Sequence, residues 1–138
     1  MHPILRNILA VLTGFVAGSI VNMSLIMMSS SIIAPPPGAD FTTSEGLKAS
    51  MHLMEPRHFI FPFLSHALGT LIGAFVTAKI AVHSKMRLAY CIGMLFLIGG
   101  VVNVFMLPSP LWFTLTDLLL AYIPMAYIGG RLGIKKQP

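Results

Sequence analysis

Four long stretches of this chain are almost entirely apolar. They cover about residues 8–27, 59–78, 88–107 and 111–130. Each is close to the roughly 20 residues with which a helix crosses the hydrocarbon core of a bilayer. Only short connections and one longer outer loop, residues 34–57, lie between them. The pattern predicts an all-α integral membrane protein, a four-transmembrane-helix bundle that forms a single domain over residues 1–138.

Small residues recur at every fourth position in the first two stretches. The small row of the first stretch is Ala10, Gly14 and Gly18, followed at the same spacing by Asn22. The small row of the second is Ser65, Gly69, Gly73 and Thr77, beside a polar row that includes His66. Such rows let two helix backbones approach closely in lipid. Because one short bundle need not bury both rows internally, we expect self-association or binding to other membrane subunits.

Prolines mark the points where helices stop or bend. The run APPPG, residues 34–38, cannot continue a helix, and Pro124 should bend the fourth helix near Leu120. After the first of these, Thr42 and Glu45 have the spacing of a capping box. Apolar residues then follow at helical spacing, namely Leu47, Met51 and Met54. We therefore predict a short amphipathic outer-surface helix between helices 1 and 2.

The distribution of charge orients the bundle. Only 9% of the residues are charged, against about 25% in soluble domains, and the net charge is +5. Seven basic residues flank one side: Arg6, Lys79, Lys85, Arg87, Arg131, Lys135 and Lys136. Only Lys48 and Arg57 lie on the other side, so both termini should be cytoplasmic in a multi-pass cell membrane protein, at the inner membrane if the cell is bacterial. The positive charge then indicates contact with membrane lipids and not with nucleic acid.

Four polar residues share one depth, one from each predicted helix. At about 1.5 Å per residue, Asn22 and Asn103 lie roughly 21–22 Å from the inner ends of their spans. His66 and Asp117 lie roughly 9–10 Å from the outer ends of theirs. A carboxylate inside a span costs at least about 2.5 kcal/mol, so it pairs with a partner or lines a wet cavity. We predict that Asp117 pairs with His66, that the two asparagines supply amide groups, and that all four form a ligand-binding layer.

A rim for this layer would come from Glu55, His58 and Thr114. Glu55 and His58 have the spacing of a di-iron ligand pair, but that motif needs a second copy and further glutamates, which the chain lacks. We therefore predict neither a metal site nor a cofactor.

Catalysis receives little support from the same residues. His66 and Asp117 have the chemistry of a base and its orienting group, with Ser65 or Thr114 as nucleophile. However, no nucleophile motif surrounds Ser65, and no lysine or arginine lies at this depth to stabilise an oxyanion. The sequence gives no positive reason to predict an enzyme.

Two functions remain open. The leading one is binding of a small solute or lipid-like molecule at the Asp117–His66 layer. The protein would then be a transporter if the bound molecule also crosses the membrane. The alternative is a structural or accessory subunit of a larger membrane complex, in which the polar groups only satisfy one another and hold the helices in register.

Overall fold

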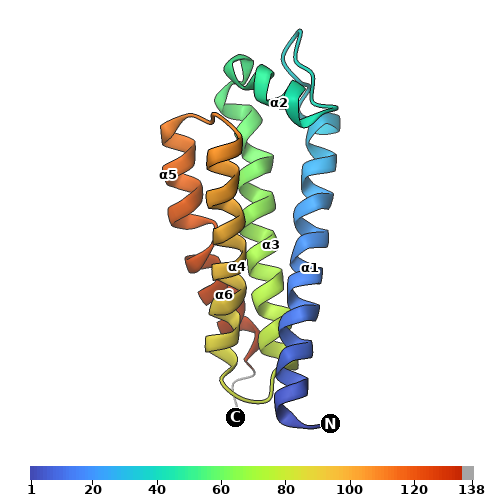
Figure 1. Ribbon diagram of the computed structural model, residues 1–138, viewed down its shortest axis with the longest axis vertical. Helices are drawn as coiled ribbons and strands as arrows, with labels where there is room; N and C mark the ends of the chain where they lie inside the picture. The colour runs from blue at the N-terminus through green and yellow to red at the C-terminus, as the bar shows by residue number, and fades with distance from the viewer. Residues whose placement is uncertain (135–138) are drawn as a thin grey trace.

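The computed structural model describes residues 1–134 as a bundle of helices without strands. Its long helices are α1 (Pro3–Ile32), α3 (Ile60–Ile80), α4 (Lys85–Met106), α5 (Leu111–Leu120) and α6 (Ile123–Gly133). Helices α1, α3 and α4 run alongside one another, whereas α5 and α6 follow one another as two parts of the fourth span (Figure 1). Helix α1 begins at the end of the bundle where α6 finishes. We call this the terminus end, and the opposite end, which carries α2, the loop end.

Four helical segments in the described part are long and apolar enough to cross a membrane, which confirms the predicted number. They are Pro3–Ile32, Pro56–Ile80, Lys85–Met106 and Leu111–Gly133. The first is longer than the predicted span of residues 8–27, because α1 starts with Pro3 in its first turn and continues almost to the proline run.

Helices α1 and α3 pack through their two rows of small residues. A Cβ added to Gly18 would lie 2.5 Å from the carbonyl oxygen of Gly69, and one on Gly73 would lie 2.9 Å from that of Gly14. The Thr77 hydroxyl donates to the carbonyl of Ala10 at 3.2 Å. The two rows therefore pack against each other within one bundle, although the sequence left open that one of them faces another subunit. The rows of small residues therefore no longer give a reason to expect self-association.

The terminus end is closed by buried side chains of α3, α4 and α6, four of which are alanines. A cluster without solvent exposure consists of Ala74, Ala78, Ala89, Ile92 and Ala126. Glycines of α6 lie directly on the backbone of α3, since a Cβ on Gly133 would be 2.5 Å from the Phe75 carbonyl oxygen. We call this region, together with the Gly14–Gly73 contact, the sealed half.

The fourth predicted span is broken where its proline predicts. Helix α5 ends at Leu120 and α6 begins at Ile123, so that Pro124 occupies the first turn of α6. Tyr122 lies in the break, with φ −117° and ψ −78°. The break lets α5 lean away from the line of α6 (Figure 1).

A short helical segment crosses the loop end, as predicted. It consists of α2 (Ser44–Ser50) and a 3-10 turn, Met51–Leu53, and we call residues 44–54 the lid. A second 3-10 turn, Pro56–Phe59, leads into α3.

The residue that caps α2 differs from the prediction. Thr43 accepts from the Gly46 amide at 2.9 Å, whereas the Thr42 hydroxyl donates to the Asp40 carboxylate at 2.6 Å. The capping-box pattern thus pointed to a residue that Asp40 already binds.

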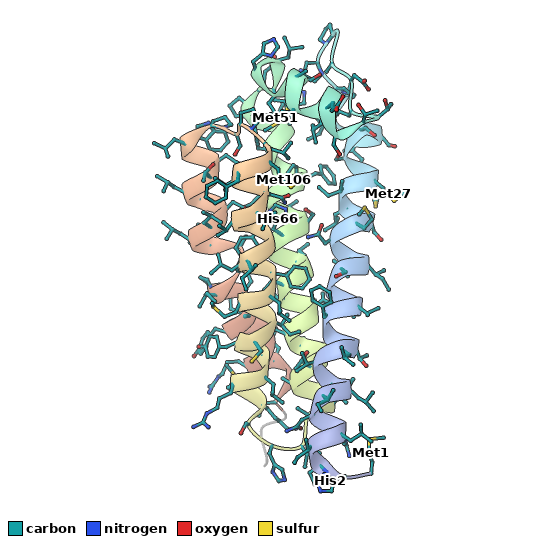
Figure 2. The ribbon with its side chains drawn as sticks, in the orientation of Figure 1. Met1, His2, Met27, Met51, His66 and Met106 are labelled. Carbon is teal, nitrogen blue, oxygen red and sulfur yellow. The ribbon has the colours of Figure 1, made fainter. Side chains whose placement is uncertain are left out.

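The apolar face of the lid packs on the bundle. Met51 is buried with Phe59 of the second 3-10 turn and Phe113 of α5. Figure 2 shows Met51 at the loop end and His66 further along α3, toward the middle of the bundle. The lid therefore covers the loop end of the helices above His66.

Candidate functional site

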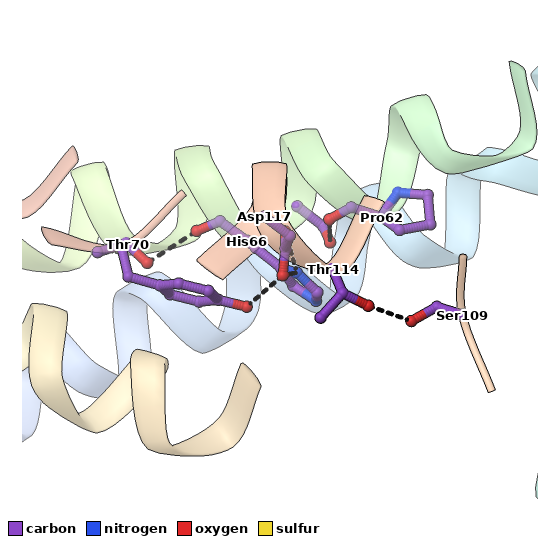
Figure 3. Close-up of polar contacts among 8 residues, drawn as sticks. Pro62, His66, Thr70, Ser109, Thr114 and Asp117 are labelled. Carbon is purple, nitrogen blue, oxygen red and sulfur yellow. Dashed lines mark hydrogen bonds and ion pairs between the residues drawn. The ribbon is translucent and has the colours of Figure 1, made fainter. Parts of the chain in front are cut away.

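The centre of the site is a buried carboxylate with two hydrogen-bond donors. Asp117 on α5 is 5% exposed. Nδ1 of His66 lies 2.8 and 2.9 Å from its two carboxylate oxygens, and the Tyr122 hydroxyl donates to Oδ2 at 2.8 Å (Figure 3). These bonds offset much of the cost of burying the carboxylate. Asp117 and His66 are paired as the sequence suggested, and Tyr122 is a third member that the sequence did not reveal.

The break between α5 and α6 brings Tyr122 to Asp117. In a continuous α-helix, residues five apart point about 140° away from each other, at 3.6 residues per turn. Here the backbone leaves helical geometry at Tyr122 itself, which turns the ring back along α5. The Pro124 signal predicted the bend, but the partner that the bend creates follows only from its three-dimensional course.

One ring nitrogen of His66 is held by Asp117, and the other has no hydrogen-bond partner in the described part of the chain. Its ring stacks against that of Tyr122, with centroids 5.7 Å apart, and its Nδ1–H donates to Asp117. In the described part of the chain Nε2 makes no hydrogen bond, and no buried side-chain nitrogen or oxygen lacks a partner. Nε2 is therefore accessible, and His66 presents it to a cavity.

This cavity has a volume of about 270 Å³ and lies between the lid and the Asp117–His66 pair. The four residues predicted to form one layer all line it: Asn22, His66, Asn103 and Asp117. Thr114 lines it as well, with its hydroxyl bonded to that of Ser109 at 2.9 Å (Figure 3). Most of the remaining wall is apolar, made by Ile26, Leu47, Met51, Met54, Phe59, Pro62, Val104, Leu107 and Phe113. No lysine or arginine is among the lining residues.

The two asparagines, predicted to supply amide groups to this layer, line the cavity without joining the Asp117 network. The side chains of Asn22 and Asn103 form no hydrogen bond within residues 1–134. Asn22 is half-buried and Asn103 is exposed. Both amides thus remain available as donors and acceptors at the cavity.

Two of the three predicted rim residues do not reach the cavity. Glu55 is exposed and pairs with Arg57 at 2.9 Å. His58 is buried, with Nδ1 accepting from the Glu55 amide at 2.8 Å and Nε2 donating to the Ala34 carbonyl at 3.1 Å. They instead tie the loop to the start of α3. In the part of the chain that the structure describes, no group of three or more His, Cys, Asp or Glu side chains could hold a metal ion.

The hydroxyl groups of both candidate nucleophiles already form hydrogen bonds within the protein. Ser65 is fully buried and its hydroxyl donates to the Pro62 carbonyl at 2.7 Å, while Thr114 is bonded to Ser109. The site can therefore exchange hydrogen bonds with a guest molecule, but its hydroxyls are not directed at the His66 ring.

No protein-family description, curated protein or solved structure matches this chain, so the functional argument rests on its own residues.

Proposed function

We propose that this chain is a membrane protein that binds a small solute or lipid-like molecule in the cavity beside His66 and Asp117. The observation that carries the proposal is a set of unpaired polar groups around one cavity. His66 Nε2 and the amides of Asn22 and Asn103 meet there without a protein partner. Ligand sites are typically apolar cavities with a few convergent polar groups of this kind.

A structural or accessory role is the second candidate, and one observation favours it. Asp117 is fully engaged by donors from α3 and from the α5–α6 break, so the network holds these segments together. A role limited to helix packing would, however, use the asparagines in the same network. Their separation from it favours ligand binding.

Binding has more support than passage through the bundle. The sealed half closes the route from the cavity to the terminus end, because α1 and α3 meet backbone to backbone at Gly14 and Gly73. Transport would require these helices to separate. We therefore propose binding as the primary activity, with transport as an extension that depends on movement of α1.

The proposed orientation has both termini in the cytoplasm, supported by the seven basic residues on that side against two on the other. Ala39→Cys, made in a Cys91→Ser background, should react in intact cells with a maleimide that does not cross membranes. Ser84→Cys, in the exposed α3–α4 turn, is the matched control and should react only after permeabilisation. The opposite labelling would move the cavity to the cytoplasmic leaflet and overturn this orientation.

The binding proposal is tested by releasing the purified protein from its native membranes into a mass spectrometer under non-denaturing conditions. The wild-type chain should carry a small-molecule adduct that Asp117→Asn, nearly identical in shape, has lost. Thr77→Val removes a hydrogen bond in the sealed half and should keep the adduct. The same adducts on wild type and Asp117→Asn, or co-purification of a fixed protein partner with no adduct, would favour the accessory role.

A further inference from the structure

The cavity is closed at both ends of the bundle. The lid forms its roof through Leu47, Met51 and Met54. At its other end, the ring of Phe96 lies against Gly18, and the sealed half follows. A guest molecule therefore needs a route through the side of the bundle.

The exposure of the lining residues locates that route. Two of them are exposed, Ile26 on α1 and Asn103 on α4, whereas the others are buried or half-buried. Nearer the terminus end, α1 and α4 are in contact through Phe15 and Phe96, whose ring centroids are 5.5 Å apart. The cavity thus opens between α1 and α4 on the loop side of this aromatic contact, and we call the Ile26–Asn103 opening the portal.

The helix surfaces beside the portal are apolar, whereas its lid side adjoins a groove that Glu45 and Lys48 line together with Asn103. Met23 and Met27 on α1 are 58% and 71% exposed, and Val102 and Met106 on α4 are 49% and 56% exposed. The part of the opening that lies between these helix surfaces faces hydrocarbon and not water when the helices span a bilayer. A molecule that enters between α1 and α4 must therefore come from the membrane.

The lining restricts the chemistry of the group that binds inside. His66 and Asp117 are the only titratable residues that line the cavity, and each is the partner of the other. No lysine or arginine lines the cavity to pair with a phosphate or carboxylate head group. Both carboxylate oxygens of Asp117 already accept hydrogen bonds from His66 and Tyr122, so an ammonium would have to compete with these donors. An uncharged hydroxyl or carbonyl group can exchange hydrogen bonds with Nε2 and the two amides at no such cost.

The size of the cavity limits how much of that molecule it holds. Its volume of about 270 Å³ is slightly below the roughly 300–1,000 Å³ of sites that enclose drug-sized ligands. It suits a head group and the beginning of a chain, and the portal leaves an apolar path for the rest.

We infer that the ligand is a single-chain, uncharged amphiphile, bound with its polar head at His66 and its tail leaving through the α1–α4 portal into the bilayer. This inference rests on the proposed binding function and adds to it the class of ligand and its lateral route.

The test uses photoactivatable probes with the purified full-length protein in phosphatidylcholine nanodiscs. A diazirine-labelled long-chain alcohol should label cavity residues at least about tenfold more than the matching fatty acid or long-chain amine, a difference equivalent to about 1.4 kcal/mol. A short-chain diazirine alcohol, which lacks the tail, should label far less. Ile26→Trp, which fills the portal, should reduce labelling by the long-chain alcohol about tenfold. Ile20→Trp, on an exposed position of α1 away from the cavity, is the matched control and should label as wild type does.

Each other outcome overturns a defined part of the inference. Strong labelling by the acid or amine would overturn the uncharged head, and equal labelling by the short alcohol would overturn the tail. If Asp117→Asn abolishes labelling but Ile26→Trp does not, the lateral route is wrong while binding in the cavity stands. If no probe labels the protein, the amphiphile is wrong. A small-molecule adduct lost in Asp117→Asn would then preserve the proposed binding function, and its absence would reject both.

Discussion

The two halves of this bundle are built from the same helices but differ in what lies between them. In the sealed half the contact positions are glycine, alanine and threonine together with Ile92, and helix backbones meet directly. In the half toward the loop end the equivalent faces carry His66, Asn22, Asn103 and aromatic rings, and a cavity of about 270 Å³ remains. Where the side chains are small, the helices pack without a cavity. Where the helices carry larger polar side chains with few protein partners, a cavity remains between them.

The difference also separates two kinds of stabilisation. Close backbone packing is steric, so that a single added side chain disrupts it over a large area. Interhelical hydrogen bonds in membranes are individually modest, averaging about 0.6 kcal/mol in measured cases. Substitutions in the sealed half should therefore cost more stability than those in the polar network.

The largest effect is expected for Gly73→Leu. The new side chain would meet the Gly14 carbonyl oxygen and the Ile92 side chain, so we expect a loss of more than about 3 kcal/mol, at or beyond the usual range for overpacking. Thermal unfolding in detergent would measure it. Gly99→Leu is the matched control, because nothing lies within 4 Å of the added Cβ, and it should melt as wild type does. Equal melting temperatures for both variants would contradict the packing of α1 on α3.

The polar network should show coupling between its members. His66→Ala and Asp117→Asn are each expected to destabilise the protein, with the double variant no worse than the poorer single one and a coupling energy of about 1–2 kcal/mol. The control cycle combines Asp117→Asn with Thr77→Val in the sealed half and should be additive within about 0.5 kcal/mol. Additivity in the first cycle would mean that the contact between His66 and Asp117 contributes nothing to stability.

A smaller, local effect distinguishes the two candidate caps of α2. Thr43→Ala removes the acceptor for the Gly46 amide and should destabilise α2 by about 0.5–2 kcal/mol. Hydrogen exchange at Gly46 should accelerate accordingly. Thr42→Ala leaves this cap in place and should change the exchange of Gly46 much less. The reverse order would restore the capping box that the sequence pattern suggested.

The smallest expected effect is the loss of stability of the loop around Asp40 at low pH. Hydrogen bonds from the Thr42 hydroxyl and amide hold the pKa of Asp40 below its ordinary value of 3.8. Because the folded pKa is depressed, the stabilisation of this loop is present above pH 3.8 and is lost as the pH falls through the lower folded value. The amide resonance of Thr42 should titrate with a midpoint below 3.8, and Asp40→Asn should abolish that titration. A midpoint at or above 3.8 in the wild-type chain would show that these bonds do not favour the carboxylate.

Much of this architecture follows from local sequence. Four apolar runs of bilayer length predict four spans, and Pro124 predicts a break because a proline inside a continuous helix would remove a helix hydrogen bond. The common depth of Asn22, His66, Asn103 and Asp117 also follows from counting at a fixed rise per residue, and these residues do surround one cavity. Depth depends on distance along each helix, which the sequence encodes directly.

The rotation of each helix about its axis, and the contacts that the break in the fourth span creates, were decided by the tertiary structure. The Gly14–Gly18 row faces Gly69–Gly73, although sequence spacing alone allowed either row to face another subunit. Tyr122 reaches Asp117 because the broken helix turns it back, and the asparagines stay apart because α1 packs on α3 and leaves an opening beside α4. A repeat shows which residues share a face, but which neighbour that face meets depends on how all the helices fill space together.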